Sequence, residues 1–201
     1  RSRLLSTRYR LGRGVEALNG EVRISSKSDL ADAAVGVAHA TRLGLEIPDI
    51  PVGTPGTEDG GPAFYALACG EATVRNLDRA GLLEALLPEL TACRTLFPQE
   101  PTHAYSVFEH TLRTLRHADS PPEGFLEELK LGVRDRESLA LAILLHDVGK
   151  IDPSADHSEL GARMTEEVGR RLRIAPEIVE TASWLVRHHL VMSRFIRLRD
   201  V

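Results

Sequence analysis

An imidazole and a carboxylate stand side by side at the end of the most apolar stretch of the chain. Residues 139–145 read LALAILL, and His146 and Asp147 follow them directly. A carboxylate in an apolar setting is costly unless it is hydrogen-bonded, ion-paired or bound to a metal. Because histidine nitrogen and carboxylate oxygen are a common ligand mixture for divalent metals, the pair predicts a metal site at the end of a buried helix.

Two residues just beyond this pair add to the prediction. Gly149 is a typical residue for the end of a helix, so we expect the apolar helix to stop there. Lys150 would then place a cation just outside the pocket, where a phosphate group could meet it. The stretch therefore favours chemistry on a phosphorylated substrate.

A third candidate, His110, lies in a predicted helix over residues 102–117. At 100° per residue it projects away from the apolar stripe of that helix, which consists of Phe108, Leu112 and Leu115. His110 therefore does not fill the core. Taken alone, the spacing favours a solvent-exposed histidine over a ligand.

His157 is expected at the start of another helix. Asp156 fits the N-cap position and Glu159 the third helical position of a capping box. The positive end of the helix dipole disfavours imidazolium, so His157 should be neutral, which suits metal ligation or hydrogen bonding. It lies on the inward stripe of that helix, so a core histidine and a site residue remain equal alternatives.

The last two candidates lie near the end of the sequence. His189 shares a face with the apolar residues of a helix that starts near Pro176, whereas His188 is turned aside toward Trp184. Asp200 stands among arginines, where an isolated aspartate is usually a surface ion-pair partner. Considered together, two imidazoles and two carboxylates on separate helices make a reasonable shell for a divalent transition metal or Mg²⁺; they are His110, His146, Asp147 and Asp200.

The elements that must position these residues are mostly helical. Asn19-Gly20 separates two short alternating runs and predicts a β-hairpin over residues 15–24. A helix is expected from about residue 28 to 45, ended by Gly44. Residues 51–62, PVGTPGTEDGGP, read as a linker. We therefore predict an N-terminal connector over residues 1–61 and an all-α bundle over residues 62–201.

Composition limits the possible classes of protein. The 201 residues include 42% apolar and 27% charged residues, which is typical of a soluble globular chain. No apolar run approaches a membrane span and the N-terminus lacks a signal-peptide core, so we expect a cytoplasmic protein. A net charge of -4 argues against an extensive nucleic-acid surface. Cys69 and Cys93 have no CxxC spacing and are expected to be free, buried thiols.

Three motifs in this order resemble the HD superfamily of metal-dependent phosphohydrolases. They are FEHTL at 108–112, LLHDVGK at 144–150 and DHSELGA at 156–162. The resemblance implies an all-α HD-domain helical bundle, here preceded by a small β-hairpin and helix. It also implies a divalent metal cofactor such as Mn, Mg, Fe or Zn, with His110, His146, Asp147 and Asp200 as ligands.

A closer resemblance comes from HAYSVFEHTL, DHSELGA and WLVRHHLVMSRFIRLRD. These segments are similar to the HD region of bifunctional uridylyltransferase and uridylyl-removing enzymes, which modify the nitrogen-regulatory PII protein. The likeness covers the chain from about Glu21 to its end. It implies that Lys150, His157 and His189 bind a second metal or the phosphate. The chain shows no nucleotidyltransferase signature, so we expect a fragment or a free-standing relative.

The resemblance implies a phosphodiesterase that removes a nucleotidyl group, UMP or AMP, from a PII-like protein, or that acts on a small nucleotide phosphoester. A metal would lower the pKa of a bound water, and Lys150 with His157 or His189 would offset charge on the phosphoryl oxygens. Two alternatives remain open: a non-catalytic nucleotide-binding module, and the HD region of a tRNA nucleotidyltransferase. The acidic balance ranks the second alternative last.

Overall fold

The structure is a computed structural model that describes residues 8–25, 27–47, 50, 60–98, 104–120 and 132–191. The chain divides into two compact units between Pro88 and Glu89. The predicted boundary at residues 61 and 62 follows a segment that lies mostly outside the described residues, and it stays a prediction. Within the described part, no helix has both the length and the apolar character that crossing a membrane requires.

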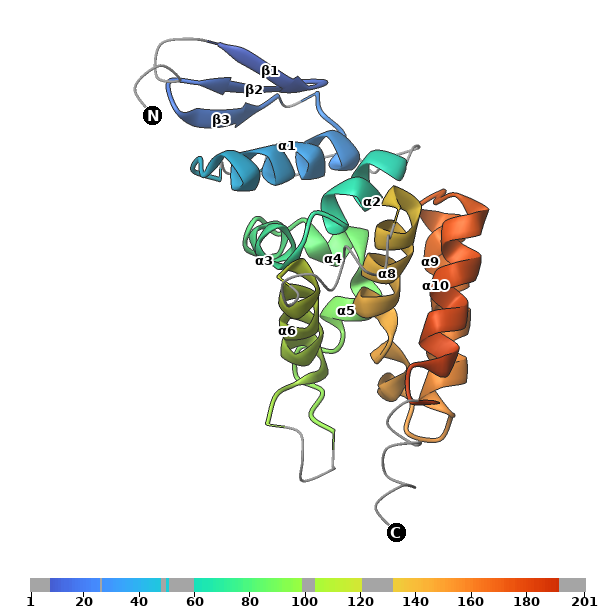
Figure 1. The fold of residues 1–201 in the computed structure, drawn as a ribbon. Coiled ribbons are helices and arrows are strands. Elements are labelled where there is room, and N and C mark those ends of the chain that lie inside the picture. The colour runs from blue at the N-terminus through green and yellow to red at the C-terminus, as the bar shows by residue number, and fades with distance from the viewer. Residues whose placement is uncertain are drawn as a thin grey trace. The chain divides into compact units, whose positions relative to one another are not determined.

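The first unit begins with a three-stranded antiparallel sheet in the order β1-β2-β3 (Figure 1). Its strands are β1 (Tyr9–Gly12), β2 (Val15–Leu18) and β3 (Glu21–Ile24). The predicted hairpin is confirmed: Leu18 pairs with Glu21, and Asn19 and Gly20 both have positive φ, as a type I′ turn requires. Strand β1 was not predicted, because its residues carry no alternating apolar pattern.

Helix α1 (Leu30–Leu43) packs on the sheet, and local sequence signals set both of its ends. Asp29 caps it by accepting a hydrogen bond from the Asp32 backbone N–H at 2.8 Å, and Gly44 ends it in the left-handed conformation at φ 64°. Val15, Val22 and Ala40 form a small core between sheet and helix. Helices α2 (Gly61–Leu67), α3 (Glu71–Arg79) and α4 (Leu83–Leu86) complete this unit. The helical segments of this unit are interrupted at Gly70 and at Gly81, which both have positive φ.

The second unit is helical, which confirms the predicted all-α bundle. After the short α5 (Pro88–Thr91), it comprises α6 (Val107–Asp119), α8 (Val133–Leu145), α9 (His157–Arg171) and α10 (Pro176–His188). Helix α8 contacts α6, α9 and α10 (Figure 1). The residues of its last turns, 140–145, are all buried. This explains the uninterrupted apolar run: a helix that is covered all round needs no polar face.

The apolar helix ends earlier than expected. Helix α8 stops at Leu145, His146 is its C-cap, and a short 3-10 helix η1 (Val148–Ile151) follows. Gly149 is therefore not the helix stop. A Cβ at this position would lie 2.2 Å from the His157 carbonyl oxygen and 2.8 Å from the Gly161 backbone nitrogen. Gly149 thus permits the close approach of η1 to the start of α9, which brings Asp147 and His157 to the same site.

The two thiols differ in exposure. Cys69 lies after the end of α2 and is exposed, so the prediction that it is buried was wrong. Cys93 is fully buried and donates to the Glu89 carbonyl oxygen at 3.4 Å. Burial, together with the charge of Asp147, raises the pKa of Cys93 to about 11.

This raised pKa predicts a loss of stability in alkali. The ordinary thiol pKa is 9.0 and the folded value is about 11, so between these values the folded chain holds a proton that the unfolded chain has released. We expect the Cys93 contribution, up to about 3 kcal/mol, to be present below pH 9 and lost as the pH rises to about 11. Urea unfolding of wild type and Cys93→Ala at several pH values checks this. Equal losses in both proteins would contradict it.

Candidate metal centre

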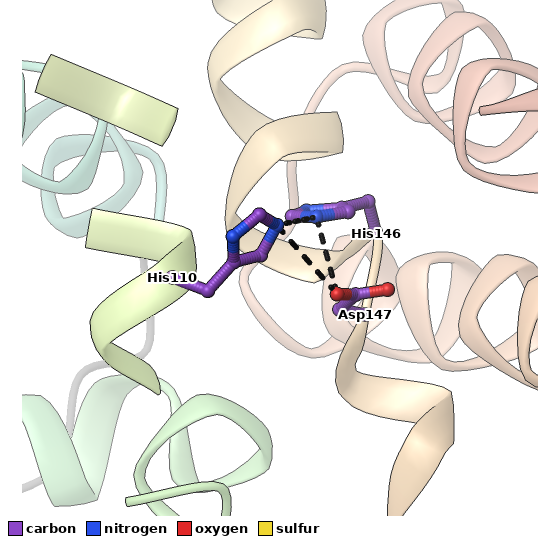
Figure 2. Close-up of side chains that lie close together, drawn as sticks. All are labelled: His110, His146 and Asp147. Atoms are coloured by element: carbon purple, nitrogen blue, oxygen red, sulfur yellow. Dashed lines mark hydrogen bonds and ion pairs between the residues drawn. The ribbon is translucent and has the colours of Figure 1, made fainter. Parts of the chain in front are cut away.

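His110, His146 and Asp147 face one another in the second unit (Figure 2). Helix α6 supplies His110, and the end of α8 supplies the other two residues. The Nε2 atoms of His110 and His146 lie 3.2 Å apart, and they lie 3.8 and 3.5 Å from Oδ2 of Asp147. Ligand atoms that share one ion at about 2.1 Å are separated by roughly 3 to 3.5 Å, so these separations fit a shared ion.

A second group uses the other oxygen of the same carboxylate. Nε2 of His189 lies 3.6 Å and Nε2 of His157 4.0 Å from Oδ1 of Asp147. The donor atoms of each three-residue group lie within 4.8 Å of one another. Asp147 is only 3% exposed and stands between the two groups, with one oxygen toward each. Its carboxylate is therefore the centre of the site.

Backbone carbonyls orient two of these imidazoles. Nδ1 of His146 lies 2.8 Å from the Ile143 carbonyl oxygen, and Nδ1 of His189 lies 2.7 Å from that of Val186. Because a carbonyl only accepts, each Nδ1 must carry the proton and donate it. In the neutral ring, Nε2 then keeps its lone pair and points it at Asp147, which is the tautomer that metal ligation needs.

Burial keeps two of the imidazoles neutral. It lowers the pKa of His146 to about 4, and the attraction of Asp147 only partly opposes this. Burial also lowers the pKa of His157. For Asp147, burial acts to raise the pKa, but His189, His146 and Lys150 outweigh it and hold the pKa below its usual value. Neutral imidazoles around an ionised carboxylate are the protonation state that binds a metal.

Two nitrogens of the site provide a test of whether a metal fits. Nε2 of His157 and Nε2 of His189 are buried and have no hydrogen-bond partner among the described residues. A buried polar atom without a partner is uncommon and calls for an explanation such as an ion. Nitrogen and carboxylate donors at these spacings suit a divalent metal such as Zn, Mn or Fe, so the site fits one.

Lys150 lies closer to the carboxylate than the sequence predicted. Its Nζ donates to Oδ2 of Asp147 at 2.8 Å, three residues along the chain. The lysine side chain is 20% exposed, so its ammonium group lies at the edge of the site where solvent begins. It is positioned to neutralise Asp147 or to reach an anion that enters beside it.

Most of the predicted site residues meet here. The structure brings together His110, His146, Asp147, Lys150, His157 and His189. Asp200 lies outside the described residues, and its predicted role as a ligand stays a prediction. His188 is turned aside as expected and contacts the ring of Trp184, with centroids 4.8 Å apart. The orienting carbonyls of Ile143 and Val186 were not predicted, because the ends of α8 and α10 could not be placed closely enough.

Residues 107–197 match the HD domain family. This match covers all six described site residues. The resemblance that the motifs indicated is confirmed.

The chain is also similar to enzymes whose activity is named. The chain is 36% identical over 183 residues to the bifunctional uridylyltransferase/uridylyl-removing enzyme of Mycobacterium tuberculosis (strain ATCC 25618 / H37Rv), which covers 90% of this chain and 21% of that protein. The enzyme of the same name from Ruegeria pomeroyi is 38% identical over 139 residues, 65% of this chain and 15% of its own length. The chain thus spans about a fifth of the length of these relatives or less.

Proposed function

We propose that this chain is a metal-dependent phosphohydrolase of the HD type that cleaves a phosphodiester. The observation that carries the proposal is the Asp147 carboxylate, which is buried between two groups of histidine nitrogens at metal-ligand spacing. A divalent metal held by His110, His146 and Asp147 would supply a Lewis acid and a source of hydroxide near neutral pH.

The remaining residues of the site have assignable roles. Lys150 places its ammonium group at the edge of the site, where it offsets the negative charge of the phosphoryl oxygens. His157 and His189 direct unpartnered nitrogens at the far side of Asp147, where they bind a second metal or the phosphate. Asp200 is proposed as a further ligand of the first metal.

The substrate class follows from the relatives. They are named for removing uridylyl groups, and their similarity extends over the HD region. We therefore propose that this chain removes a nucleotidyl group, UMP or AMP, from a PII-like protein.

One observation favours a second function. Lys150 already neutralises Asp147 at 2.8 Å, so the carboxylate has a partner without any metal. This arrangement suits a non-catalytic module that binds a nucleotide by its phosphate. Metal analysis of the purified chain, followed by hydrolysis of bis-p-nitrophenyl phosphate with added Mn²⁺, Mg²⁺ or Fe²⁺, separates the two functions. Absence of both metal and hydrolysis would overturn the hydrolase and favour the module.

Removing His110 should weaken the metal site selectively. It lies on a different helix from the other ligands of the first group, so His110→Ala deletes one ligand without altering the end of α8. We expect the affinity for Mn²⁺, measured by calorimetry, to fall by about 10-fold to 100-fold or more. His117→Ala, an exposed histidine on the same helix, is the matched control and should bind Mn²⁺ like the wild type. Equal affinities of all three proteins would exclude His110 as a ligand.

A further inference from the structure

An exposed aromatic ring stands at the start of the helix that carries His110. Tyr105 immediately precedes the N-cap of α6 and is 41% exposed. The guanidinium carbon of Arg113 lies 3.8 Å from the centre of the tyrosine ring, and Arg113 Nε donates to Glu109 at 3.0 Å. The ring is therefore held against a cation that is itself fixed by a carboxylate.

The capping geometry places Tyr105 at the same end of α6 as His110. Ser106 is the N-cap of α6, and its hydroxyl accepts a hydrogen bond from the Glu109 backbone N–H at 3.3 Å. Tyr105 is then the N′ residue and His110 the fourth helical residue. In N-terminal caps these two positions lie next to each other, which is the basis of the hydrophobic staple. Arg113 lies one turn beyond His110 on the same helix.

A purely structural role does not account for the exposure of the ring. A staple stabilises a helix by burying its N′ side chain, yet two-fifths of Tyr105 remains in contact with solvent. An exposed tyrosine with a cation against it presents a flat, electron-rich surface. Nucleobases stack on such rings whatever their hydrogen-bonding pattern, and an arginine at the ring adds to the attraction.

We propose that Tyr105, backed by Arg113, is the stacking surface for the base of the nucleotide whose phosphorus lies at the metal centre. This inference rests on the proposed function and extends it, because it assigns a specificity-determining residue to the substrate. Arg113 is a positioning residue that holds the ring, and Glu109 in turn holds Arg113.

Two esters that differ only in the nucleoside test the inference. They are the p-nitrophenyl ester of UMP and methyl p-nitrophenyl phosphate, assayed with Mn²⁺. For Tyr105→Ala we expect KM for the UMP ester to rise about tenfold with kcat nearly unchanged, and no change with the methyl ester. Tyr105→Phe should behave like the wild type, because stacking needs the ring and not the hydroxyl. Trp184→Ala, another exposed aromatic of the same unit, is the matched control.

An equal effect of Tyr105→Ala on both esters would overturn the inference, since it would indicate a shift of α6 and not loss of stacking. A parallel measurement does not depend on turnover. Calorimetric binding of UMP and of ribose 5-phosphate should show an approximately tenfold preference for UMP that Tyr105→Ala removes. If the wild type hydrolyses neither ester but still prefers UMP over ribose 5-phosphate, the proposed hydrolase is overturned and the stacking surface is retained. Equal binding of the two phosphates to the wild type would overturn the stacking surface itself.

Discussion

Asp147→Ala is expected to abolish metal binding and to lower phosphodiester hydrolysis by about a thousandfold or more. Asp147 offers one oxygen to each group of histidines, so its removal deletes the shared ligand of both. Metal content by elemental analysis should fall from about one or more ions per chain to near zero. Asp152→Asn, an exposed carboxylate of the same loop, is the matched control and should keep both metal and activity.

The Asp147→Ala variant also distinguishes two roles for Asp147, that of a metal ligand and that of a structural ion-pair partner. If Asp147 serves mainly to neutralise a buried cation, its loss should strand that cation and cost roughly 3 to 5 kcal/mol. The cation next to it is Lys150, whose side chain is 20% exposed and can extend its ammonium group into water. We therefore expect Asp147→Ala in excess chelator to melt close to the wild type. A variant that keeps its metal and melts much earlier would contradict the assignment of Asp147 as a ligand.

Gly149→Val is expected to disrupt the site through the backbone. A Cβ at residue 149 would overlap the carbonyl oxygen of His157 at 2.2 Å, and backbone atoms cannot turn away as a flexible side chain can. Relieving the overlap requires η1 to separate from the start of α9, which moves His157 away from Asp147. We expect a loss of about 3 kcal/mol or more in the free energy of unfolding, together with weaker metal binding.

Gly132→Val is the matched control for this prediction. Gly132 is the exposed N-cap of α8 with an extended backbone, and its nearest neighbour would be the flexible side chain of Asp135 at 3.3 Å. Its loss of stability should stay below about 1.5 kcal/mol. Urea unfolding of the three proteins gives the comparison. A Gly149→Val protein as stable as the control would show that η1 and α9 are not held at this separation.

The sequence predicted those parts of the fold that rest on local signals. Asp29 and Gly44 bound α1 through a cap and a left-handed residue, and Asn19-Gly20 makes the hairpin turn, so each could be placed from a few neighbouring residues. Strand β1 depends on pairing with β2, which no local pattern reveals. The predicted end of α8 was wrong because Gly149 is required by its close backbone contact with α9 and does not end the helix that precedes it.

The residues of the candidate site likewise differ in whether local sequence signals identify them. His146 and Asp147 were identifiable because they interrupt an apolar run, whereas the periodicity around His110 left exposure as the simpler interpretation. Only the packing of α6 against α8 brings His110 Nε2 to 3.2 Å from that of His146. The ion pair of Lys150 with Asp147 and the tautomers of His146 and His189 likewise depend on distances that spacing along the chain does not contain.

We propose that hydrolysis of a nucleotidyl ester takes place at the metal site around Asp147. Its most direct test is an isotope measurement: the chain is stripped with chelator, reloaded with Mn²⁺, and incubated with an aryl ester of UMP in H₂¹⁸O. We expect UMP that carries one ¹⁸O atom on phosphorus. It should be formed by the Mn²⁺-loaded wild type and by His117→Ala, and it should be absent without metal and in Asp147→Ala. A metal-loaded wild type that releases no labelled UMP, or an Asp147→Ala protein that releases it at the wild-type rate, would contradict hydrolysis at this site.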